Sequence, residues 1–325
     1  MPAYDLEVHL DEADLAAQLR ADAHTGLSAP AKWLPPKYFY DARGSELFEQ
    51  ITRLPEYYPT RLERAILTTH ADQIAAITGA RTLVELGSGS SEKTRLLLNA
   101  LGQRGTLRTF VPLDVSSTAL AEAVAALGRL YPELEIRGVV GDFERHLKLL
   151  PRTGRRMVAF LGGTIGNLQP GERARFLSEL RSTLEPGEWL LLGAGLVTDP
   201  AVLVPAYDDA SGVTAEFNRN VLRVLNRELD GDFDPSAFAH VAVWDDTAEW
   251  IEMRLRATRP MTVQLPALPL TVAFTEGEEI RTEISAKFRR DGLARELRAA
   301  GFALRHWWTD PDQRFSLSLA EAAQR

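Results

Sequence analysis

Between residues 82 and 196, short apolar runs alternate with segments in which apolar side chains recur every three or four positions. The apolar runs are, in order, "TLVEL", "TFVPLDV", "EIRGVVGDF", "RRMVAFLGG" and "EWLLLGAGL". Runs of this length predict buried strands, and the longer segments between them predict helices. Five buried strands that alternate with helices indicate an α/β fold with a parallel, doubly wound sheet. Because such a sheet binds ligands at the carboxyl ends of its strands, candidate chemistry is expected at that edge.

The pattern changes after about residue 197. Residues 206–229 have a helical pattern, and the stretches "EWIEMRLRAT" and "LPLTVAF" alternate polar and apolar positions, as antiparallel strands do. A helix at 291–302 then precedes "ALRHWWTD" and "RFSLSLA", two predicted strands joined by "PDQ". We therefore expect an insertion at 198–285, followed by an antiparallel hairpin that completes the first sheet.

Residues 1–61 are helical in character and contain an aromatic and proline-rich loop that begins at Lys32. Within this loop, Ser45 is expected to cap a short helix that ends before Pro55. A longer helix is expected over about Arg61–Thr78. With 325 residues, the chain is long enough for two domains. We predict one domain of residues 62–197 and 286–325, and a second, α+β domain of residues 1–61 and 198–285.

Composition narrows the classes of function. The sequence has no cysteine, and its six histidines form no HxH or HxxxH pair, so neither disulfides nor a metal are expected. A net charge of −8 disfavours a nucleic acid partner, and the basic spots Arg152–Arg156 and Lys287–Arg290 read as solvated surface. No apolar run approaches the roughly 20 residues of a membrane span, and the first thirty residues lack the apolar core of a signal peptide. We expect a cytoplasmic monomer that acts on a small molecule.

A glycine turn follows the first predicted strand, in "LVELGSGSSEK". Gly87 and Gly89 allow a sharp turn and a close approach of the backbone to a ligand, and Glu85 stands just before them. The third glycine of the dinucleotide fingerprint is missing, because Glu92 occupies its position. A carboxylate there would repel a pyrophosphate, whereas S-adenosylmethionine (SAM) has no phosphate and carries a cationic amino group and sulfonium. The turn therefore favours SAM as the cofactor.

The next strand ends add further candidates. Asp114 ends the second strand and is expected to accept hydrogen bonds from ribose hydroxyls. Asp142 and Phe143 follow the third strand, where they would meet the adenine amino group and ring. Lys93 either reaches the cofactor carboxylate or lies on an exposed helix face.

Several longer motifs occur together, namely "PPKYFYD", "LPEYYPTR", "FLGGTIGNL", "YDDASGVTAEFNRNVL" and "TEISAKF". With the glycine turn, they closely resemble the histidine-specific Nα-methyltransferases of ergothioneine biosynthesis, a family that trimethylates histidine to hercynine. The resemblance extends from about residue 30 to "WWTD", which is nearly the whole chain. It implies a Rossmann-like class I methyltransferase core, which ends in an antiparallel hairpin, and a separate substrate-binding domain.

The resemblance also implies roles for single residues. Those that would bind the amino acid are Tyr57, Asn167, Tyr207, Met253, Glu283 and Ser285. Those that would orient the reacting amine are Tyr40, Tyr57 and Asn167. Those carried over for SAM are Gly87, Lys93, Asp114, Asp142 and Phe143. Glu283 would accept from one imidazole N–H while Ser285 or Tyr57 serves the other nitrogen. By sequence alone, Glu283 in "RTEIS" reads as an exposed strand acid.

Other interpretations stay open at this point. The chain departs from the family pattern at Gly163 and Gly195, where a serine and an aspartate are more common. An N-methyltransferase of another amino acid, such as tryptophan, shares every feature above except the ring-binding residues. A non-catalytic cofactor-binding partner protein is a second alternative, and a nicotinamide-dependent reductase is a third that conflicts with the missing glycine.

Overall fold

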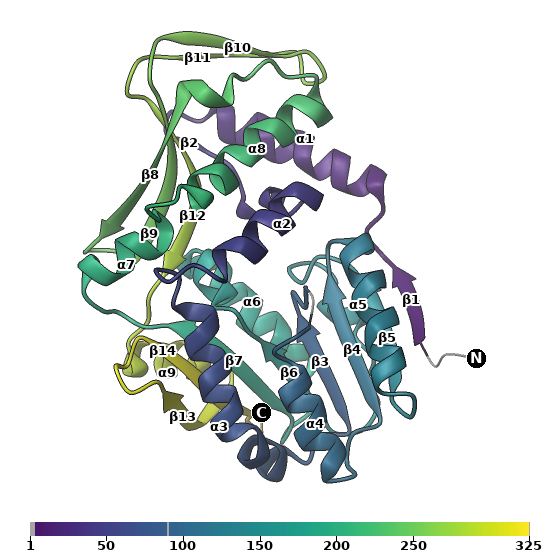
Figure 1. The fold of residues 1–325 in the computed structure, drawn as a ribbon. Coiled ribbons are helices and arrows are strands. Elements are labelled where there is room, and N and C mark those ends of the chain that lie inside the picture. The colour runs from purple at the N-terminus through teal and green to yellow at the C-terminus, as the bar shows by residue number, and fades with distance from the viewer. Residues whose placement is uncertain (1–3, 90, 325) are drawn as a thin grey trace. The chain divides into compact units, whose positions relative to one another are not determined.

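The structure is a computed structural model that describes residues 4–89 and 91–324 (Figure 1). The chain forms two compact units. The first unit holds the chain up to Leu10, then Pro59–Val197 and the chain from Phe288 onward. The second unit holds Asp11–Tyr58 and Thr198–Lys287.

The first unit is built on an eight-stranded sheet with the order β1-β5-β4-β3-β6-β7-β14-β13. Its strands are β1 (Tyr4–Val8), β3 (Thr82–Leu86), β4 (Thr109–Asp114), β5 (Glu135–Val140), β6 (Arg156–Phe160), β7 (Trp189–Gly195), β13 (Phe302–Thr309) and β14 (Phe315–Ala322). In this order, each pair of neighbours from β1 as far as β7 is parallel. Strand β14 is antiparallel to both β7 and β13. The predicted α/β fold with a closing antiparallel hairpin is confirmed. The strand order reverses between β3 and β6, so the turn after β3 lies at a topological switch point.

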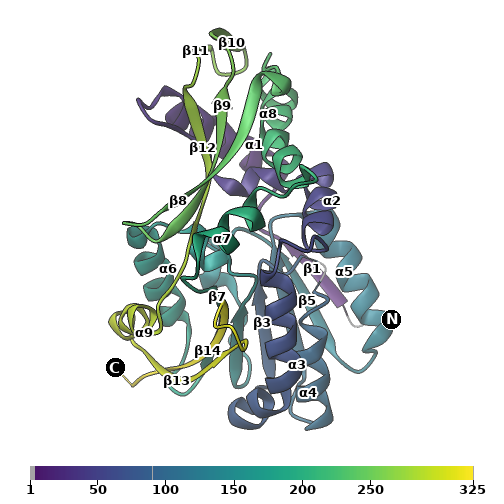
Figure 2. The ribbon, with the colours of Figure 1, turned by 60° about the vertical axis from the view of Figure 1, so that its left-hand side comes forward.

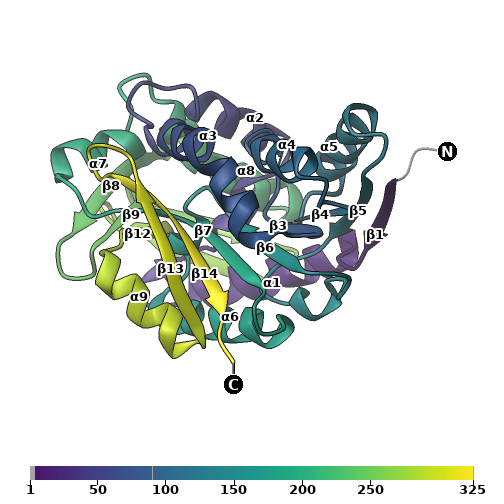
Figure 3. The ribbon, with the colours of Figure 1, turned by 90° about the horizontal axis from the view of Figure 1, so that it is seen from below.

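Helices cover both faces of this sheet (Figure 3). On one face lie α3 (Pro59–Thr78), α4 (Arg95–Gln103) and α5 (Ser117–Leu130), and on the other lie α6 (Pro170–Thr183) and α9 (Arg290–Ala299). The 3-10 turns η2 (Leu147–Leu149) and η3 (Thr164–Asn167) follow β5 and β6. The central strands β3, β4, β6 and β7 are buried on both faces, with Leu83 and Phe110 fully inaccessible to solvent, which is why they read as uninterrupted apolar runs.

The first strand is a feature that the sequence analysis did not find. Residues 1–61 read as helical and were assigned to the second domain, whereas β1 pairs in parallel with β5, from Tyr4 opposite Ile136 to Val8 opposite Val140. It is a short edge strand whose Asp5, Glu7 and Val8 are exposed, while Leu6 packs on the core. Its sequence "YDLEV" alternates apolar and polar residues as a strand does, so the signal was present in the sequence and was overlooked.

The second unit contains a four-stranded sheet with the order β2-β12-β9-β8 and a separate hairpin (Figures 1 and 2). The sheet strands are β2 (Lys32–Trp33), β8 (Phe238–Asp245), β9 (Trp250–Ala257) and β12 (Glu279–Ala286), and the hairpin strands are β10 (Met261–Leu265) and β11 (Leu270–Phe274). The helices are α1 (Glu12–Ser28), η1 (Pro36–Phe39), α2 (Ala42–Ile51), α7 (Pro200–Tyr207), α8 (Val213–Leu229) and η4 (Pro235–Ala237). The predicted antiparallel strands are confirmed, but they belong to two sheets rather than one.

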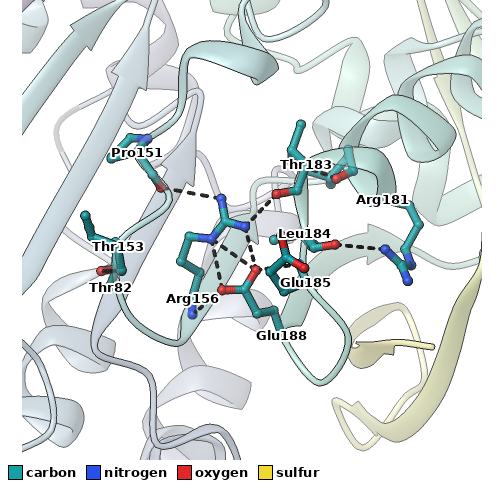
Figure 4. A network of polar contacts seen from close by, with 10 residues as sticks. Thr82, Pro151, Thr153, Arg156, Arg181, Thr183, Leu184, Glu185 and Glu188 are labelled. Atoms are coloured by element: carbon teal, nitrogen blue, oxygen red, sulfur yellow. Dashed lines mark hydrogen bonds and ion pairs between the residues drawn. The ribbon is translucent and has the colours of Figure 1, made fainter. Parts of the chain in front are cut away.

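A buried ion pair joins the amino ends of β6 and β7 (Figure 4). The Arg156 guanidinium is 1% exposed and donates to both Glu188 carboxylate oxygens and to the backbone oxygen of Thr183. Glu188 also accepts from the backbone N–H groups of Arg156 and Glu185. Nearly every polar atom of the pair has a partner. The network therefore links the amino ends of β6 and β7, at the sheet edge opposite the candidate site.

Candidate functional site

The turn after β3 is shaped by two glycines and anchored by a buried acid. Gly87 and Gly89 have φ values of 66° and 49°, in the left-handed region, and a Cβ atom at either position would meet nothing within 4 Å. Glu85 accepts hydrogen bonds from the hydroxyls of Ser91 and Thr94, which fixes the turn against the start of α4. Burial raises the pKa of Glu85 to about 7, against the lowering effect of these bonds.

Asp114 ends β4 beside this turn. Its Oδ2 accepts from the backbone N–H of Gly89 at 2.9 Å, and its Oδ1 accepts from that of Ser116 at 3.0 Å. Each carboxylate oxygen has two lone pairs, so one on each remains to accept a further donor. Burial raises the pKa of Asp114. The arrangement suits a ligand with two neighbouring hydroxyl groups, as a ribose has.

Replacing Asp114 with alanine should weaken SAM binding roughly 10- to 100-fold, because hydrogen bonds to a charged group contribute about 1.5–3 kcal/mol. Isothermal titration with S-adenosylhomocysteine gives the affinity directly. Glu133→Ala, an exposed acid between α5 and β5, is the control and should bind as the unmodified protein does. Unchanged affinity in Asp114→Ala would remove this residue from the cofactor site.

Asp142 and Phe143 follow β5. Asp142 is 5% exposed, its Oδ1 accepts from the backbone N–H of Glu144, and its own N–H donates to Nδ1 of His146. Among the described residues Oδ2 of Asp142 has no hydrogen-bond partner and is left for a ligand. The Phe143 ring packs edge-on against Phe160, with ring centroids 5.0 Å apart. The ring is also edge-on to Phe176, with centroids 5.6 Å apart, and the residue is half-buried.

Lys93 does not lie on an exposed helix face. Its ammonium forms an ion pair with Glu63, a fully buried residue of α3. Glu63 also accepts from the backbone N–H of Gly162, at 2.8 Å, in the turn after β6. The predicted contact of Lys93 with the cofactor carboxylate stays a prediction. Glu63 itself was missed by the sequence analysis, since nothing in "RLERAIL" distinguishes it from a surface glutamate.

The cofactor half of the site fits SAM on two structural observations. The space above Gly87 and Gly89 is open, and the buried Oγ of Ser88 has no hydrogen-bond partner among the residues that the structure describes. An orphaned buried hydroxyl is costly unless a ligand satisfies it. Asn167, at the end of η3 after β6, is half-buried in the same unit and at the same edge of the sheet.

The remaining predicted residues lie in the second unit, where a β-bulge redirects strand β12. Arg281 pairs with Arg254 of β9 and Glu283 with Met253, so one residue of β12 is extra between them. The hydroxyl of the extra residue, Thr282, has its single proton within reach of two acceptors, Oδ1 of Asn218 at 2.6 Å and the backbone oxygen of Met253 at 3.0 Å. The bulge turns Glu283 away from the face that carries Arg281 and onto the face of Met253.

At this face of β12 lies a group that we call the β12 cluster, which consists of Glu283 and Ser285 of β12, Lys287 directly after it, Met253 of β9 and Tyr207 of α7. All five side chains are buried, with Glu283 9% exposed and Lys287 6% exposed. Tyr207 Oη and Ser285 Oγ are 2.8 Å apart, and the Lys287 ammonium donates to both, at 2.8 Å and 2.7 Å. Glu283, in contrast, makes no hydrogen bond to any described residue. The cluster thus offers a carboxylate that is open to a ligand donor next to a hydroxyl pair.

Charge in the β12 cluster is governed by burial. Burial raises the pKa of Glu283 to about 7, and the nearby positive charge of Lys287 opposes that rise. Burial lowers the pKa of Lys287 to about 7, and the Glu283 carboxylate opposes that fall. Burial and the Glu283 charge both raise the pKa of Tyr207, which keeps its hydroxyl protonated. A donor that reaches Glu283 would therefore find a strong acceptor in an apolar setting.

Tyr57 and Tyr40 lie in an aromatic group of the same unit. The Tyr57 ring is edge-on to both Tyr207 and Phe48, with centroids 6.3 Å and 6.2 Å apart. Tyr40 packs edge-on against Phe48 and Phe217, at 5.5 Å and 5.6 Å. Tyr57 therefore contacts the β12 cluster directly, and Tyr40 is connected to it through Phe48.

The interpretation of both basic spots as solvated surface was wrong in part. Arg156 and Lys287 are buried, and the other basic residues of the two spots, such as Arg155 and Arg290, are exposed. A signal for Lys287 did exist, because Glu283, Ser285 and Lys287 alternate as residues on one face of a strand do. Among residues 4–89 and 91–324, no group of three or more metal-ligating side chains occurs. None of the helices in this described part has the length and apolar character that a membrane span requires.

The closing hairpin β13–β14 and a glycine turn that lacks the third dinucleotide glycine define the class of protein, a SAM-dependent methyltransferase. A family profile described as "Histidine-specific methyltransferase, SAM-dependent" matches residues 19–322. The chain belongs to this family, and the predicted family, cofactor and enzyme class are confirmed.

Named relatives cover nearly the whole chain. The histidine N-alpha-methyltransferase of Mycolicibacterium smegmatis is 58% identical over 309 residues, 95% of this chain and 96% of that protein. The protein of the same name from Mycobacterium tuberculosis is 56% identical over 312 residues, 96% of this chain and 97% of that protein. A more distant relative, the 4-dimethylallyltryptophan N-methyltransferase easF of Aspergillus fumigatus, is 26% identical over 321 residues, 94% of each chain.

Proposed function

We propose that this enzyme transfers three methyl groups from SAM to the α-amino group of L-histidine and so forms hercynine for ergothioneine biosynthesis. The observation that carries the proposal is the buried Glu283 carboxylate, which accepts no hydrogen bond from a described residue, beside the Ser285 and Tyr207 hydroxyls. Such a group is able to accept from a ligand donor, and the names of the two most similar relatives reported above supply histidine as the candidate. The monomeric state and the cytoplasmic location stay predictions from sequence.

Cofactor binding is assigned to residues of the first unit. Asp114 would accept from the ribose hydroxyls, Asp142 from the adenine amino group, and Phe143 would lie against the adenine ring. Lys93, whose charge is paired with Glu63, would donate a remaining ammonium proton to the cofactor carboxylate. When bound, SAM supplies a methyl group on a sulfonium, which a nucleophile displaces in line.

The acceptor amine must first become neutral, because an ammonium has no lone pair. Asn167 and the hydroxyls of Tyr40 and Tyr57 would orient the neutral amine and pass its proton towards water. We assign no strong general base. Tyrosine faces tolerate a quaternary ammonium by cation–π attraction, which supports three successive transfers.

Ring recognition follows from hydrogen-bond counting. Neutral imidazole has one N–H donor and one bare nitrogen, so Glu283 would accept from the first while Ser285 or Tyr57 serves the second. Met253, directly opposite Glu283 on β9, would lie beside the ring. An amino acid without a second ring donor or acceptor would leave a buried polar group unpaired, which is a strong basis for rejection.

The main alternative is N-methylation of another amino acid, since the name of one distant relative includes a tryptophan derivative. Incubation with SAM and each of the twenty amino acids, followed by mass spectrometry, decides between them. We expect histidine to gain the mass of three CH₂ units, and the other amino acids to gain none. Methylation of tryptophan in place of histidine would overturn the proposal. Binding of SAM and histidine without any turnover would instead indicate a non-catalytic partner protein.

A further inference from the structure

Lys287 is the member of the β12 cluster that the proposed function leaves unused. It follows β12 directly, and its backbone N–H donates to the backbone oxygen of Glu249. Its side chain is 6% exposed, and two of its three ammonium protons are directed to the Tyr207 and Ser285 hydroxyl oxygens. Burial of an ammonium costs free energy unless hydrogen bonds and a counter-charge compensate it, so the position of Lys287 requires an explanation.

Hydrogen-bond counting gives that reason. The Tyr207 and Ser285 oxygens are 2.8 Å apart, so one hydroxyl donates to the other. The phenol is the more acidic group, which favours Tyr207 as the donor. Ser285 Oγ then accepts from both Tyr207 and Lys287, and its two lone pairs are occupied. Its only remaining capacity is to donate its own proton to a ligand.

The cluster is therefore polarised into one acceptor and one donor. Glu283 accepts, and Ser285 donates. A neutral imidazole matches this pair, with an N–H for Glu283 and a bare nitrogen for Ser285. An imidazolium has two N–H groups, so one of them would face the Ser285 proton, and its charge would meet the Lys287 ammonium.

We propose that Lys287 is a specificity-determining residue that makes the β12 cluster bind an uncharged ring and reject a cationic one. This inference rests on the proposed function, because it concerns the ring of the same amino acid. Lys287 acts through Ser285 and through the charge of Glu283, so it is a positioning residue rather than a catalytic one. The mutual effect of the two charges on their pKa values supports the pairing.

Other ionisable groups near the cluster must be accounted for. His240 of β8 bonds to the backbone oxygen of Tyr207, and burial lowers its pKa, so it stays neutral near pH 7. Asp208, next to Tyr207, is exposed. On the opposite face of the sheet, Arg254 pairs with Glu252 and Glu279. Tyr57 contacts the Tyr207 ring. None of these groups is altered when Lys287 is replaced, so a comparison of variants cancels their contributions.

The test is proton release on histidine binding at pH 6, measured by calorimetry in buffers of different ionisation enthalpy. Free imidazole has a pKa of about 6.5, so at pH 6 most of the ligand is protonated and must lose a proton to bind neutral. Burial raises the pKa of Glu283 to about 7, so Glu283 also loses its proton when it accepts from the ring, both in the unmodified protein and in the variant. We expect Lys287→Met to release about one proton fewer than the unmodified protein, because the ring then binds as a cation beside Glu283. Lys287→Arg keeps the positive charge and should retain the original release.

Lys32→Met is the matched control, since Lys32 is a half-buried, ion-paired lysine of the same sheet. It should release as many protons as the unmodified protein. A Lys287→Met variant with unaltered proton release would overturn the inference, because a merely structural lysine changes affinity equally at every pH.

A second measurement needs no variant. The ¹⁵N chemical shifts of labelled histidine bound to the unmodified protein at pH 6 report the ring protonation directly. A neutral bound ring is expected, and a cationic bound ring would overturn the inference while the proposed function stands. If histidine does not bind the unmodified protein at any pH, the proposed function itself fails.

Discussion

Glu283→Gln should raise the histidine Kd about 100-fold while it leaves the affinity for S-adenosylhomocysteine within about twofold. A hydrogen bond to a charged group contributes roughly 1.5–3 kcal/mol, and glutamine keeps only a neutral oxygen in its place. The substitution also leaves the Lys287 ammonium without its buried counter-charge, which places the loss near the upper end of that range. Calorimetric titration with each ligand separates the two affinities, and kcat/KM for histidine should fall in parallel.

Glu279→Gln is the control for this variant. Glu279 lies on the same strand but before the bulge, on the charged face, where it pairs with Arg254 and Arg256. Its loss should change histidine affinity little, because exposed and half-exposed ion pairs contribute only about 0–1 kcal/mol. If Glu283→Gln weakened both ligands equally, Glu283 would be a structural residue and the assignment of the ring would be wrong.

The bulge at Thr282 explains why the sequence alone assigned Glu283 to the surface. Strict alternation from Glu279 and Arg281 puts Glu283 on the charged face with them. One extra residue reverses that assignment for the rest of the strand, and the acceptor of its hydroxyl proton, Oδ1 of Asn218, lies far away in the chain. A local pattern carries no information about such a partner, so only the family resemblance placed Glu283 in the amino acid site.

The cofactor half was predicted more completely, for a physical reason. Buried parallel strands are continuous apolar runs, and their carboxyl ends are marked by the polar residue that follows, as with Asp114 and Asp142. Glu63 and Lys287 were not predicted as site residues, because what distinguishes each of them is its burial in the folded chain. A glutamate on a helix and a lysine in a basic spot are ordinarily exposed, and their partners Gly162 and Tyr207 lie far from them in sequence.

Arg156 is another charged residue whose burial the sequence does not reveal, and its replacement should have the largest effect on the free energy of unfolding. Arg156→Met leaves the Glu188 carboxylate buried without its counter-charge, which costs about 3–5 kcal/mol. It also removes the donor to the backbone oxygen of Thr183. Urea unfolding followed by fluorescence should show this loss, whereas Arg155→Met, at an exposed neighbouring position, should change the free energy of unfolding by less than about 0.5 kcal/mol.

Two further measurements separate the ion pair from simple packing. The double variant Arg156→Met with Glu188→Leu removes both charges, so it should recover most of the lost stability, because well-packed apolar pairs are often as stable as buried ion pairs. Additive losses in the double variant would contradict the charge argument. SAM affinity of the folded single variant should be unchanged, since Arg156 begins β6 whereas the cofactor residues follow the opposite ends of the strands. Buried charges thus serve two different purposes in this chain. Arg156 stabilises the amino ends of two strands of the large sheet, and we propose that Lys287 determines which form of the ligand is bound.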